Sequence, residues 1–403
     1  MGEMMVELRR AQEMLLERTK RMIETEFISL WDAVNRVLAE DIYAGHDQPP
    51  FPRSPLDGYA LQSSDIKGAS KEHPVTLTVI DEVDAGYVSR ACVEEGTAVR
   101  IMTGAPIPDG ADCIVGQEDT DYGEETVEIY EEIQAYENYC YAGEDYKAGT
   151  KILEKDTLLG HVEAGILASL GVEEVRVYRR PRVSVLTTGD ETILPGEPLG
   201  PGKIYDSNLY TLATRLTSLG IDVIQRDHVD DDSGAAVKWI KANAEESDII
   251  ITTGGVSVGR KDIMHEVTER LGCEQIFWKI LIKPGMPTLC AQYRETLLIC
   301  LSGNPFGAAV NLELLVRPVL AKQTGRKDLE LKRVSAVAEN GFPKRSGVTR
   351  YVRAYYGDGR VRIPEGSNAS GILSSMRGCN CLMEIPAGTV SVGKGDRVWV
   401  VLL

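Results

Sequence analysis

Glycines, hydroxyls and a carboxylate stand together in the run Thr-Thr-Gly-Gly-Val-Ser-Val-Gly-Arg-Lys-Asp at residues 252–262. Gly254, Gly255 and Ser257 would let backbone N–H groups approach a phosphate closely, beside the positive end of the helix predicted to follow. Asp262 suits a divalent cation that bridges to phosphate. The alternative is structural: the glycines form a tight turn and Asp262 caps the helix.

A second candidate anion site is Ser302-Gly303-Asn304-Pro305, which follows the apolar run 297–301. Proline fits the first position of a helix, because the N–H that it lacks would have no partner there. The three residues before it offer hydroxyl, amide and backbone donors. These groups could cradle an anion, or they could form an ordinary helix cap.

Two acidic stretches follow predicted strands. Residues 187–191 read Thr-Thr-Gly-Asp-Glu, and residues 230–232 are all aspartates. Carboxylates such as Glu191 and Asp231 repel phosphate unless a cation lies between them. Either stretch could instead be a solvated turn or a helix cap.

Two lysines occur in the run Trp-Lys-Ile-Leu-Ile-Lys-Pro-Gly at residues 278–285. If this run is a single strand, Lys279 and Lys283 point to the same side of it. They could clamp an anion, or they could lie on a solvated face. Positive charge at these loops would act against the negative field of the whole chain.

The composition limits the classes of function. The chain has 403 residues, with 44 Lys and Arg against 61 Asp and Glu, and a net charge of −17. This is the balance of a globular protein of roughly two to four domains. It disfavours nucleic-acid binding and an anionic membrane surface. No apolar stretch reaches the ~20 residues of a transmembrane helix.

Eight cysteines are scattered along the chain, and only Cys379 and Cys381 are close together. No histidine accompanies them at the spacing of a zinc site. Several of the others lie inside apolar runs. We expect buried, reduced thiols and therefore a cytoplasmic protein.

The elements that position these loops follow from the hydrophobic pattern. From residue 182 onward, strand-like and helix-like segments alternate, which predicts a mostly parallel sheet covered on both faces. Ligands bind at the carboxyl ends of the strands in such sheets. Strands are expected at 183–188, 222–228, 248–253, 275–282, 287–292 and 296–301. Helices are expected at 207–220, with Asp206 or Ser207 as cap, and at 233–245, 261–271 and 305–322.

Outside this region, the spacing predicts a helical entry over 5–42 that ends before a proline cluster at 49–52. Strands are predicted at 75–80, 126–130 and 172–178, and a helix at 161–170. The expected fold class is a multidomain α/β protein. Its predicted parts are a helical and linking domain (1–48 with 146–180), a β-rich insertion (49–145), an α/β domain (181–326) and a small β domain (327–403).

Seven motifs, in this order, resemble the molybdopterin molybdenumtransferase family, called MoeA in bacteria and related to the C-terminal region of gephyrin. Each motif is weak alone, but together they span nearly the whole chain. They are Ala-Val-Asn-Arg-Val-Leu-Ala-Glu-Asp at 33–41, Ser-Pro-Leu-Asp-Gly-Tyr-Ala at 54–60, Thr-Gly-Ala-Pro at 103–106, Ala-Gly-Glu-Asp at 142–145, Thr-Gly-Asp-Glu at 188–191, Thr-Gly-Gly-Val-Ser-Val-Gly at 253–259 and Ser-Gly-Asn-Pro at 302–305.

The resemblance implies a homodimer whose α/β domain is similar to the molybdopterin adenylyltransferases and binds molybdopterin. It implies that molybdate is inserted into adenylylated molybdopterin, with Mg²⁺ as cofactor and with release of AMP. A molybdopterin adenylyltransferase is a further candidate partner.

The resemblance also implies residue roles. The implied catalytic residues are Asp57, Thr103, Glu191, Asp231 and Asp262, of which Glu191 and Asp262 would bind the metal. The implied substrate-binding residues are Gly254, Gly255, Ser257, Lys279, Lys283, Ser302, Gly303, Asn304, Arg350 and Ser374 or its neighbour Ser375. Asp145 is a further acidic residue of the β-rich insertion that contains Asp57 and Thr103.

The sequence departs from the family pattern at Asn35, Leu56 and Gln117 and, with most consequence for the site, at 139–141. Residues 139–141 read Tyr-Cys-Tyr where relatives often have arginine, so charge for an anion would have to come from elsewhere. The alternatives that stay open are a molybdopterin adenylyltransferase, a nucleotide pyrophosphatase of similar fold, a tungstate-specific insertase, and a non-catalytic scaffold similar to gephyrin.

Overall fold

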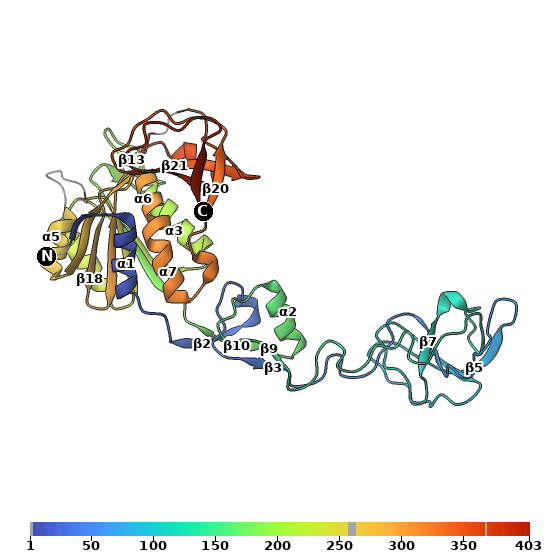
Figure 1. Ribbon diagram of the computed structural model, residues 1–403. Coiled ribbons are helices and arrows are strands. Elements are labelled where there is room, and N and C mark those ends of the chain that lie inside the picture. The colour runs from blue at the N-terminus through green and yellow to red at the C-terminus, as the bar shows by residue number, and fades with distance from the viewer. Residues whose placement is uncertain (1–2, 257–262, 367–368) are drawn as a thin grey trace. The chain divides into compact units, whose positions relative to one another are not determined.

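The computed structural model describes residues 3–256, 263–366 and 369–403. The chain forms two compact units (Figure 1). Unit 1 comprises Met1–Ala39, Leu158–His161 and Glu174–Leu403, and unit 2 comprises Glu40–Thr157 and Val162–Glu173. Among the described residues, every helix is too short or too polar to cross a membrane.

A seven-stranded sheet forms the centre of unit 1, in the order β1-β16-β18-β19-β15-β11-β14. Its strands are β1 (Glu3–Val6), β11 (Arg182–Thr188), β14 (Asp222–Val229), β15 (Ile249–Thr253), β16 (Glu274–Ile280), β18 (Leu289–Tyr293) and β19 (Thr296–Leu301). The neighbours β19, β15, β11 and β14 are parallel, whereas β18 is antiparallel to both of its neighbours. The predicted mostly parallel sheet is confirmed, and β1 adds an edge strand that the sequence did not predict.

Helices cover both faces of this sheet (Figure 1). One face carries α1 (Leu8–Arg18), α3 (Asn208–Ser218), α6 (Pro305–Asn311) and α7 (Arg317–Thr324), and the other carries α4 (Ser233–Asn243) and α5 (Ile263–Leu271). The side chains of β15 pack against both layers of helices: Ile249 and Ile251 belong to the core beneath α1, α3, α6 and α7, and Ile250 belongs to the core beneath α4 and α5. A strand buried on both faces needs apolar side chains at every position. A π-helical segment, η3 (Leu312–Val316), joins α6 to α7, so the helix predicted at 305–322 is present with an irregular centre.

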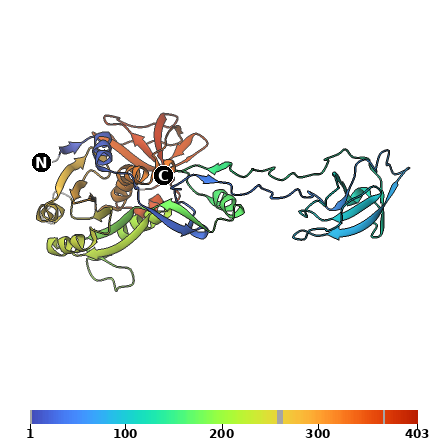
Figure 2. The same cartoon turned by 90° about the horizontal axis from the view of Figure 1, so that it is seen from below.

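The C-terminal residues of unit 1 form a small closed barrel, whose strands are grouped in orange and red in Figure 2. Its strands are β20 (Arg333–Ala338), β21 (Thr349–Gly357), β22 (Arg360–Arg362), β23 (Cys381–Ile385) and β24 (Arg397–Leu402). The ring closes because β23 pairs with both β24 and β21. Outside the ring, the short strand β17 (Ile282–Lys283) pairs in parallel with β21. The short helices η4 (Lys327–Leu329) and η5 (Leu373–Met376) complete this part.

Unit 2 is built on a five-stranded sheet in the order β7-β4-β6-β5-β8. Its elements are β3 (Ile42–Tyr43), β4 (Gly58–Leu61), β5 (Val75–Val83), β6 (Thr97–Ile101), β7 (Cys113–Gly116), η2 (Gln117–Asp119), β8 (Thr126–Ile129), β9 (Lys151–Leu153) and α2 (His161–Ser169). The strands predicted at 75–80 and 126–130 and the helix predicted at 161–170 are therefore confirmed.

The predicted helical entry over 5–42 is wrong beyond Arg18. The chain leaves α1 and forms β2 (Thr25–Ser29) and the short helix η1 (Leu30–Asp32). β2 pairs with β10 (Glu174–Tyr178), and tertiary pairing of this kind overrides a local helical pattern. The predicted common face of Lys279 and Lys283 is also wrong, because β16 ends at Ile280 and Lys283 belongs to β17.

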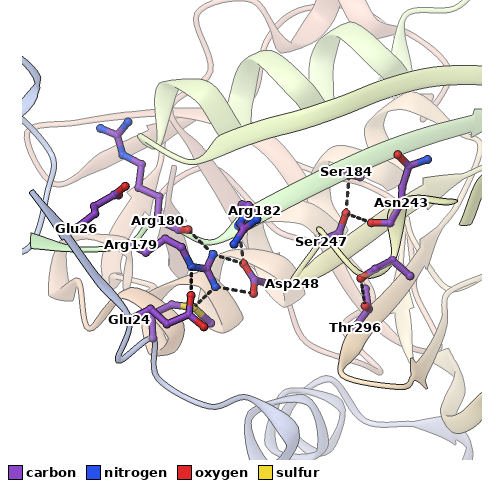
Figure 3. Close-up of polar contacts among 12 residues, drawn as sticks. Glu24, Glu26, Arg179, Arg180, Arg182, Ser184, Asn243, Ser247, Asp248 and Thr296 are labelled. Carbon is purple, nitrogen blue, oxygen red and sulfur yellow. Dashed lines mark hydrogen bonds and ion pairs between the residues drawn. The ribbon is translucent and has the colours of Figure 1, made fainter. Parts of the chain in front are cut away.

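A charged network ties the segment that follows β10 to the main sheet (Figure 3). The Arg179 guanidinium donates to both carboxylate oxygens of Asp248, at 2.8 and 3.0 Å, and to Glu24 at 2.6 Å. The backbone N–H of Arg182 also donates to Asp248, at 2.7 Å. The Asp248 carboxylate hydrogen-bonds to Arg179 and holds the pKa of the guanidinium above its ordinary value. The network therefore anchors the chain where it enters β11.

We expect Asp248→Asn to lower the free energy of unfolding of unit 1 by roughly 1.5–3 kcal/mol, because it weakens charged hydrogen bonds at a site shielded from water. All four tryptophans, Trp31, Trp239, Trp278 and Trp399, belong to unit 1, so denaturant unfolding followed by their fluorescence reports on this unit.

The matched control is Arg294→Ala, which breaks an ion pair with Glu245 whose side chains are 61% and 78% exposed. Its effect is expected to stay within about 0.5 kcal/mol, as for other surface pairs. Equal effects of the two substitutions would contradict the anchoring role of Asp248.

Candidate functional site

The three loops with predicted chemistry meet at one end of the main sheet. β11, β15 and β19 are adjacent and parallel, and their register sets Thr187 beside Thr253 and Thr253 beside Leu301. The loops that follow these strands line a cavity of about 440 Å³, which we call the acidic cavity. It brings together the predicted residues Glu191, Asp231, Gly254, Gly255, Ser302, Gly303 and Asn304.

Two glycines allow these loops to approach each other. Gly254 has a φ of +102°, and a Cβ atom there would lie 2.2 Å from the carbonyl oxygen of Thr188. A Cβ on Gly303 would lie 3.3 Å from the Cα of Gly254. A left-handed backbone and a backbone contact this close both select glycine. The loop glycines predicted to let a ligand approach therefore also pack the wall of the cavity.

The start of α3 lines the same cavity, and its part in the site was missed by the sequence analysis. Tyr205, Asp206, Ser207 and Asn208 all face it. The Asn208 amide donates to the Thr253 hydroxyl at 3.1 Å and to the Gly303 carbonyl at 2.8 Å, so it ties two of the strand-end loops together. The signal is the polar run Asp-Ser-Asn at 206–208, in which Asp206 or Ser207 was expected only to cap the helix.

The carboxylates of the acidic cavity lie in an unfavourable electrostatic setting. Burial raises the pKa of Asp231, and the negative charges of Asp190 and Glu191 raise it further. Asp232 has a different role, since its carboxylate caps α4 by accepting from the N–H groups of Gly234 and Ala235. Among residues 3–256, 263–366 and 369–403, no three His, Cys, Asp or Glu side chains are arranged to hold a metal ion by themselves.

A second cavity of about 540 Å³ adjoins the first and shares Pro287, Ser302 and Asn304 with it. We call it the basic cavity. Four cationic residues line it, and its described lining contains no Asp or Glu. They are Lys283, Lys344, Arg350 and Arg353. In a chain with a net charge of −17, this is a concentrated positive surface.

The β17–β21 pairing builds the basic cavity, because it sets Lys283 directly opposite Arg350 in register. The Arg350 guanidinium lies 5.5 Å from the centre of the Phe342 ring, and burial lowers its pKa. Its Nε atom is buried and has no hydrogen-bond partner among the described residues. A buried donor without a partner is costly, so an anion bound here would satisfy it.

Several predicted residues lie elsewhere. Lys279 lines neither cavity; its ammonium group lies 4.1 Å from the centre of the Trp278 ring. Ser374 is exposed on η5 and also lines neither cavity, as does its neighbour Ser375. Ser257 and Asp262 lie outside the described residues.

In unit 2, the structure brings Asp57 and Thr103 together. The backbone N–H and the hydroxyl of Thr103 both donate to Asp57 Oδ1, at 2.7 and 2.6 Å. These bonds lower the pKa of Asp57. Asp145 is exposed in the same unit. In the stretch at 139–141, which departs from the family pattern, the rings of Tyr139 and Tyr141 form a cluster with that of Tyr136. The ring centres are 5.0 to 5.9 Å apart.

Three family models match successive parts of the chain. The MoeA N-terminal region (domain I and II) matches residues 6–171. A probable molybdopterin binding domain matches residues 184–322. The MoeA C-terminal region (domain IV) matches residues 335–403.

Curated relatives and solved structures agree with these matches. The chain is 36% identical over 387 residues to the molybdopterin molybdenumtransferase of Bacillus subtilis, covering 94% of this chain and 90% of the relative. It is 35% identical over 378 residues to that of Staphylococcus aureus, covering 93% and 90%. The crystal structure of the molybdopterin biosynthesis MoeA protein of Pyrococcus horikoshii matches with a TM-score of 0.80 at 30% identity, covering 99% of this chain and 100% of that one.

We expect Thr103→Val to raise the pKa of Asp57 toward its ordinary value, because the hydroxyl donor is lost while the backbone donor stays. A lowered carboxylate pKa contributes stability above the unfolded-state value, and this contribution is lost as the pH falls through the folded-state value. The variant should therefore be less stable than the parent at neutral pH, and the difference should vanish in acid.

Carboxyl ¹³C NMR titration measures the pKa of Asp57 directly. The control is Thr97→Val, because the Thr97 hydroxyl donates to the carbonyl of Glu94 in the same unit. An Asp57 titration that is identical in Thr103→Val and in the parent would show that the hydroxyl does not control this carboxylate.

Proposed function

The chain belongs to the MoeA family of molybdopterin molybdenumtransferases, and on this premise we propose that it inserts molybdate into adenylylated molybdopterin with release of AMP. It is a transferase of molybdenum cofactor biosynthesis, as its curated relatives are. A molybdopterin adenylyltransferase would supply the substrate. A cytoplasmic location agrees with the burial of four free thiols, those of Cys113, Cys290, Cys300 and Cys381.

One observation carries the proposal: two cavities of opposite character meet at Ser302 and Asn304. The reaction needs two anions side by side, a phosphoanhydride and an oxyanion, which repel each other in a low-dielectric cleft. The glycine loops and Ser302 suit the phosphoanhydride, because backbone N–H groups bind phosphate. Lys283 and Arg350 suit molybdate, because they add positive charge without competing carboxylates.

The carboxylates of the acidic cavity fit Mg²⁺. This ion usually takes one or two protein carboxylates together with substrate phosphates. Glu191 and Asp231 line the cavity that we assign to the phosphoanhydride. Burial is the main cause of the raised pKa of Asp231, and the negative charges of Asp190 and Glu191 add to it, so a cation in this cavity would relieve part of the cost. The predicted ligands are Glu191 and Asp262, and we propose Asp231 as a further one because it lines the same cavity as Glu191. Bound there, Mg²⁺ would neutralise charge on the departing phosphate.

In the reaction, water adds to phosphorus as the P–O bond to AMP breaks, and AMP leaves with a proton. The two thiols of molybdopterin bond to molybdenum, while one molybdate oxygen leaves as water with the two thiol protons. The residues of the chain hold the groups for this exchange. Asn208 keeps the glycine loops in place, Ser302 lies where the cavities meet, and Arg350 holds the oxyanion. Positioning of this kind converts an encounter of two anions into a reaction within one complex.

The decisive assay is AMP release from adenylylated molybdopterin with Mg²⁺, with and without molybdate. The proposal expects release that depends on both Mg²⁺ and the oxyanion. Arg350→Gln should raise the molybdate concentration that gives half-maximal release by roughly 10- to 100-fold. This is the loss of affinity expected when one charged hydrogen bond is removed.

Arg333→Gln is the control, because Arg333 lies on the same barrel but pairs with Glu384 outside both cavities. Release of AMP without an oxyanion, or equal effects of the two substitutions, would overturn the assignment. A response to tungstate but not to molybdate would show a tungstate-specific insertase.

We also infer a homodimer, which is supported by exposed apolar side chains on unit 1. Ile23, Phe27 and Trp31 are 82%, 65% and 95% exposed. Contiguous exposed apolar patches mark protein interfaces, and we infer that these three side chains belong to one.

We expect light scattering to give the mass of a dimer, and Phe27→Glu with Trp31→Glu to shift it toward the 44.2 kDa of one chain. Tyr87→Glu is the control, because Tyr87 is an exposed aromatic residue of unit 2. A monomeric parent, or a double variant that stays fully dimeric, would contradict this inference.

A further inference from the structure

His228 lies behind the wall of the acidic cavity and has no part in the proposed chemistry. It is on β14, directly beside Thr187 of β11 in the register of the sheet. Its side chain is 12% exposed, and its Nδ1 atom is 3.7 Å from Asp206 Oδ2. Thr187, Thr192 and Asp206 all line the cavity, so the imidazole contacts three residues of the wall from behind.

The hydroxyl groups of the two threonines near His228 already donate hydrogen bonds to other acceptors. Both oxygens of Asp206 accept hydrogen bonds, Oδ1 from the N–H of Leu209 at 3.0 Å and Oδ2 from the Thr187 hydroxyl in a short contact. The Thr192 hydroxyl donates to the carbonyl of Gly189 at 3.0 Å. Each threonine has one hydroxyl proton, so neither can donate to the imidazole.

The imidazole must therefore be the donor. Its Nδ1 atom is 3.1 Å from Thr187 Oγ1 and 3.4 Å from Thr192 Oγ1, while its Nε2 atom is 3.5 Å from Thr192 Oγ1. The shortest contact places a proton on Nδ1. The result is a directed chain, from His228 Nδ1–H to the Thr187 oxygen and from the Thr187 hydroxyl to the Asp206 carboxylate.

We propose that His228 is a positioning residue of the acidic cavity, held as the Nδ1–H tautomer, and that it orients the Asp206 carboxylate through the Thr187 hydroxyl. The partner of one ring nitrogen usually decides which nitrogen carries the proton, and that choice orients the groups beyond it. This inference deepens the proposed function, on which its kinetic test rests. Its spectroscopic test does not depend on that function.

The spectroscopic test uses ¹⁵N NMR of the imidazole rings of the whole chain without substrate. The chain has five histidines, and the signals of His228 are identified by their loss in His228→Gln. The proposal expects the neutral ring of His228 to carry its proton on Nδ1, and to change to Nε2 in Thr187→Val. A proton on Nε2 in the parent would overturn the proposal.

The kinetic test compares two amide replacements. Asparagine places an N–H near the position of Nδ1, and glutamine places one near that of Nε2. His228→Asn should keep the KM for adenylylated molybdopterin within about twofold, whereas His228→Gln should raise it by roughly tenfold with kcat little changed, the loss expected when a supporting hydrogen bond is removed.

A merely structural role gives a different pattern, since partial unfolding lowers the apparent kcat and leaves KM unchanged. Equal behaviour of the two variants would overturn the positioning role. If no AMP is released by the parent itself, the proposed function fails, and the NMR result alone then decides the tautomer.

Discussion

The proposed reaction must hold a phosphoanhydride and an oxyanion side by side, although these two anions repel each other. The structure separates positive and negative side chains into adjoining cavities instead of mixing them. Carboxylates such as Glu191 can then attract a cation on one side while Arg350 attracts an oxyanion on the other. Ser302 and Asn304, which belong to both cavities, mark where the reacting groups would meet.

The fold supplies these two environments from different parts of unit 1. Parallel strands end at a common edge, so β11, β15 and β19 bring glycine loops and carboxylates together. The basic cavity has another origin, because it needs the barrel. The two-residue strand β17 reaches from the α/β part to β21 and sets Lys283 beside Arg350. Neither part alone would hold both charges.

The features that could be predicted from the sequence are those that local residue patterns determine. The alternation of strands and helices indicated the parallel sheet, and the loops with Gly254 and Ser302 proved to share a cavity. The sequence could not predict what depends on distant pairing. β1 joins the sheet through β16, and Lys279 turns away to lie over Trp278. Asp206 joins the cavity wall as well as accepting a hydrogen bond from the N–H of Leu209 in the first turn of α3. A local sequence pattern cannot predict such contacts, because they depend on residues that are distant in the sequence.

The position of a bound oxyanion shows whether the two cavities divide the anions between them. Tungstate matches molybdate in charge and nearly in size, and its anomalous scattering locates it without ambiguity in a crystal soaked with tungstate, AMP and Mg²⁺. We expect one tungsten peak in the basic cavity, within hydrogen-bonding distance of Arg350 and Lys283. A peak among the carboxylates of Glu191 and Asp231, with the basic cavity empty, would contradict this expectation.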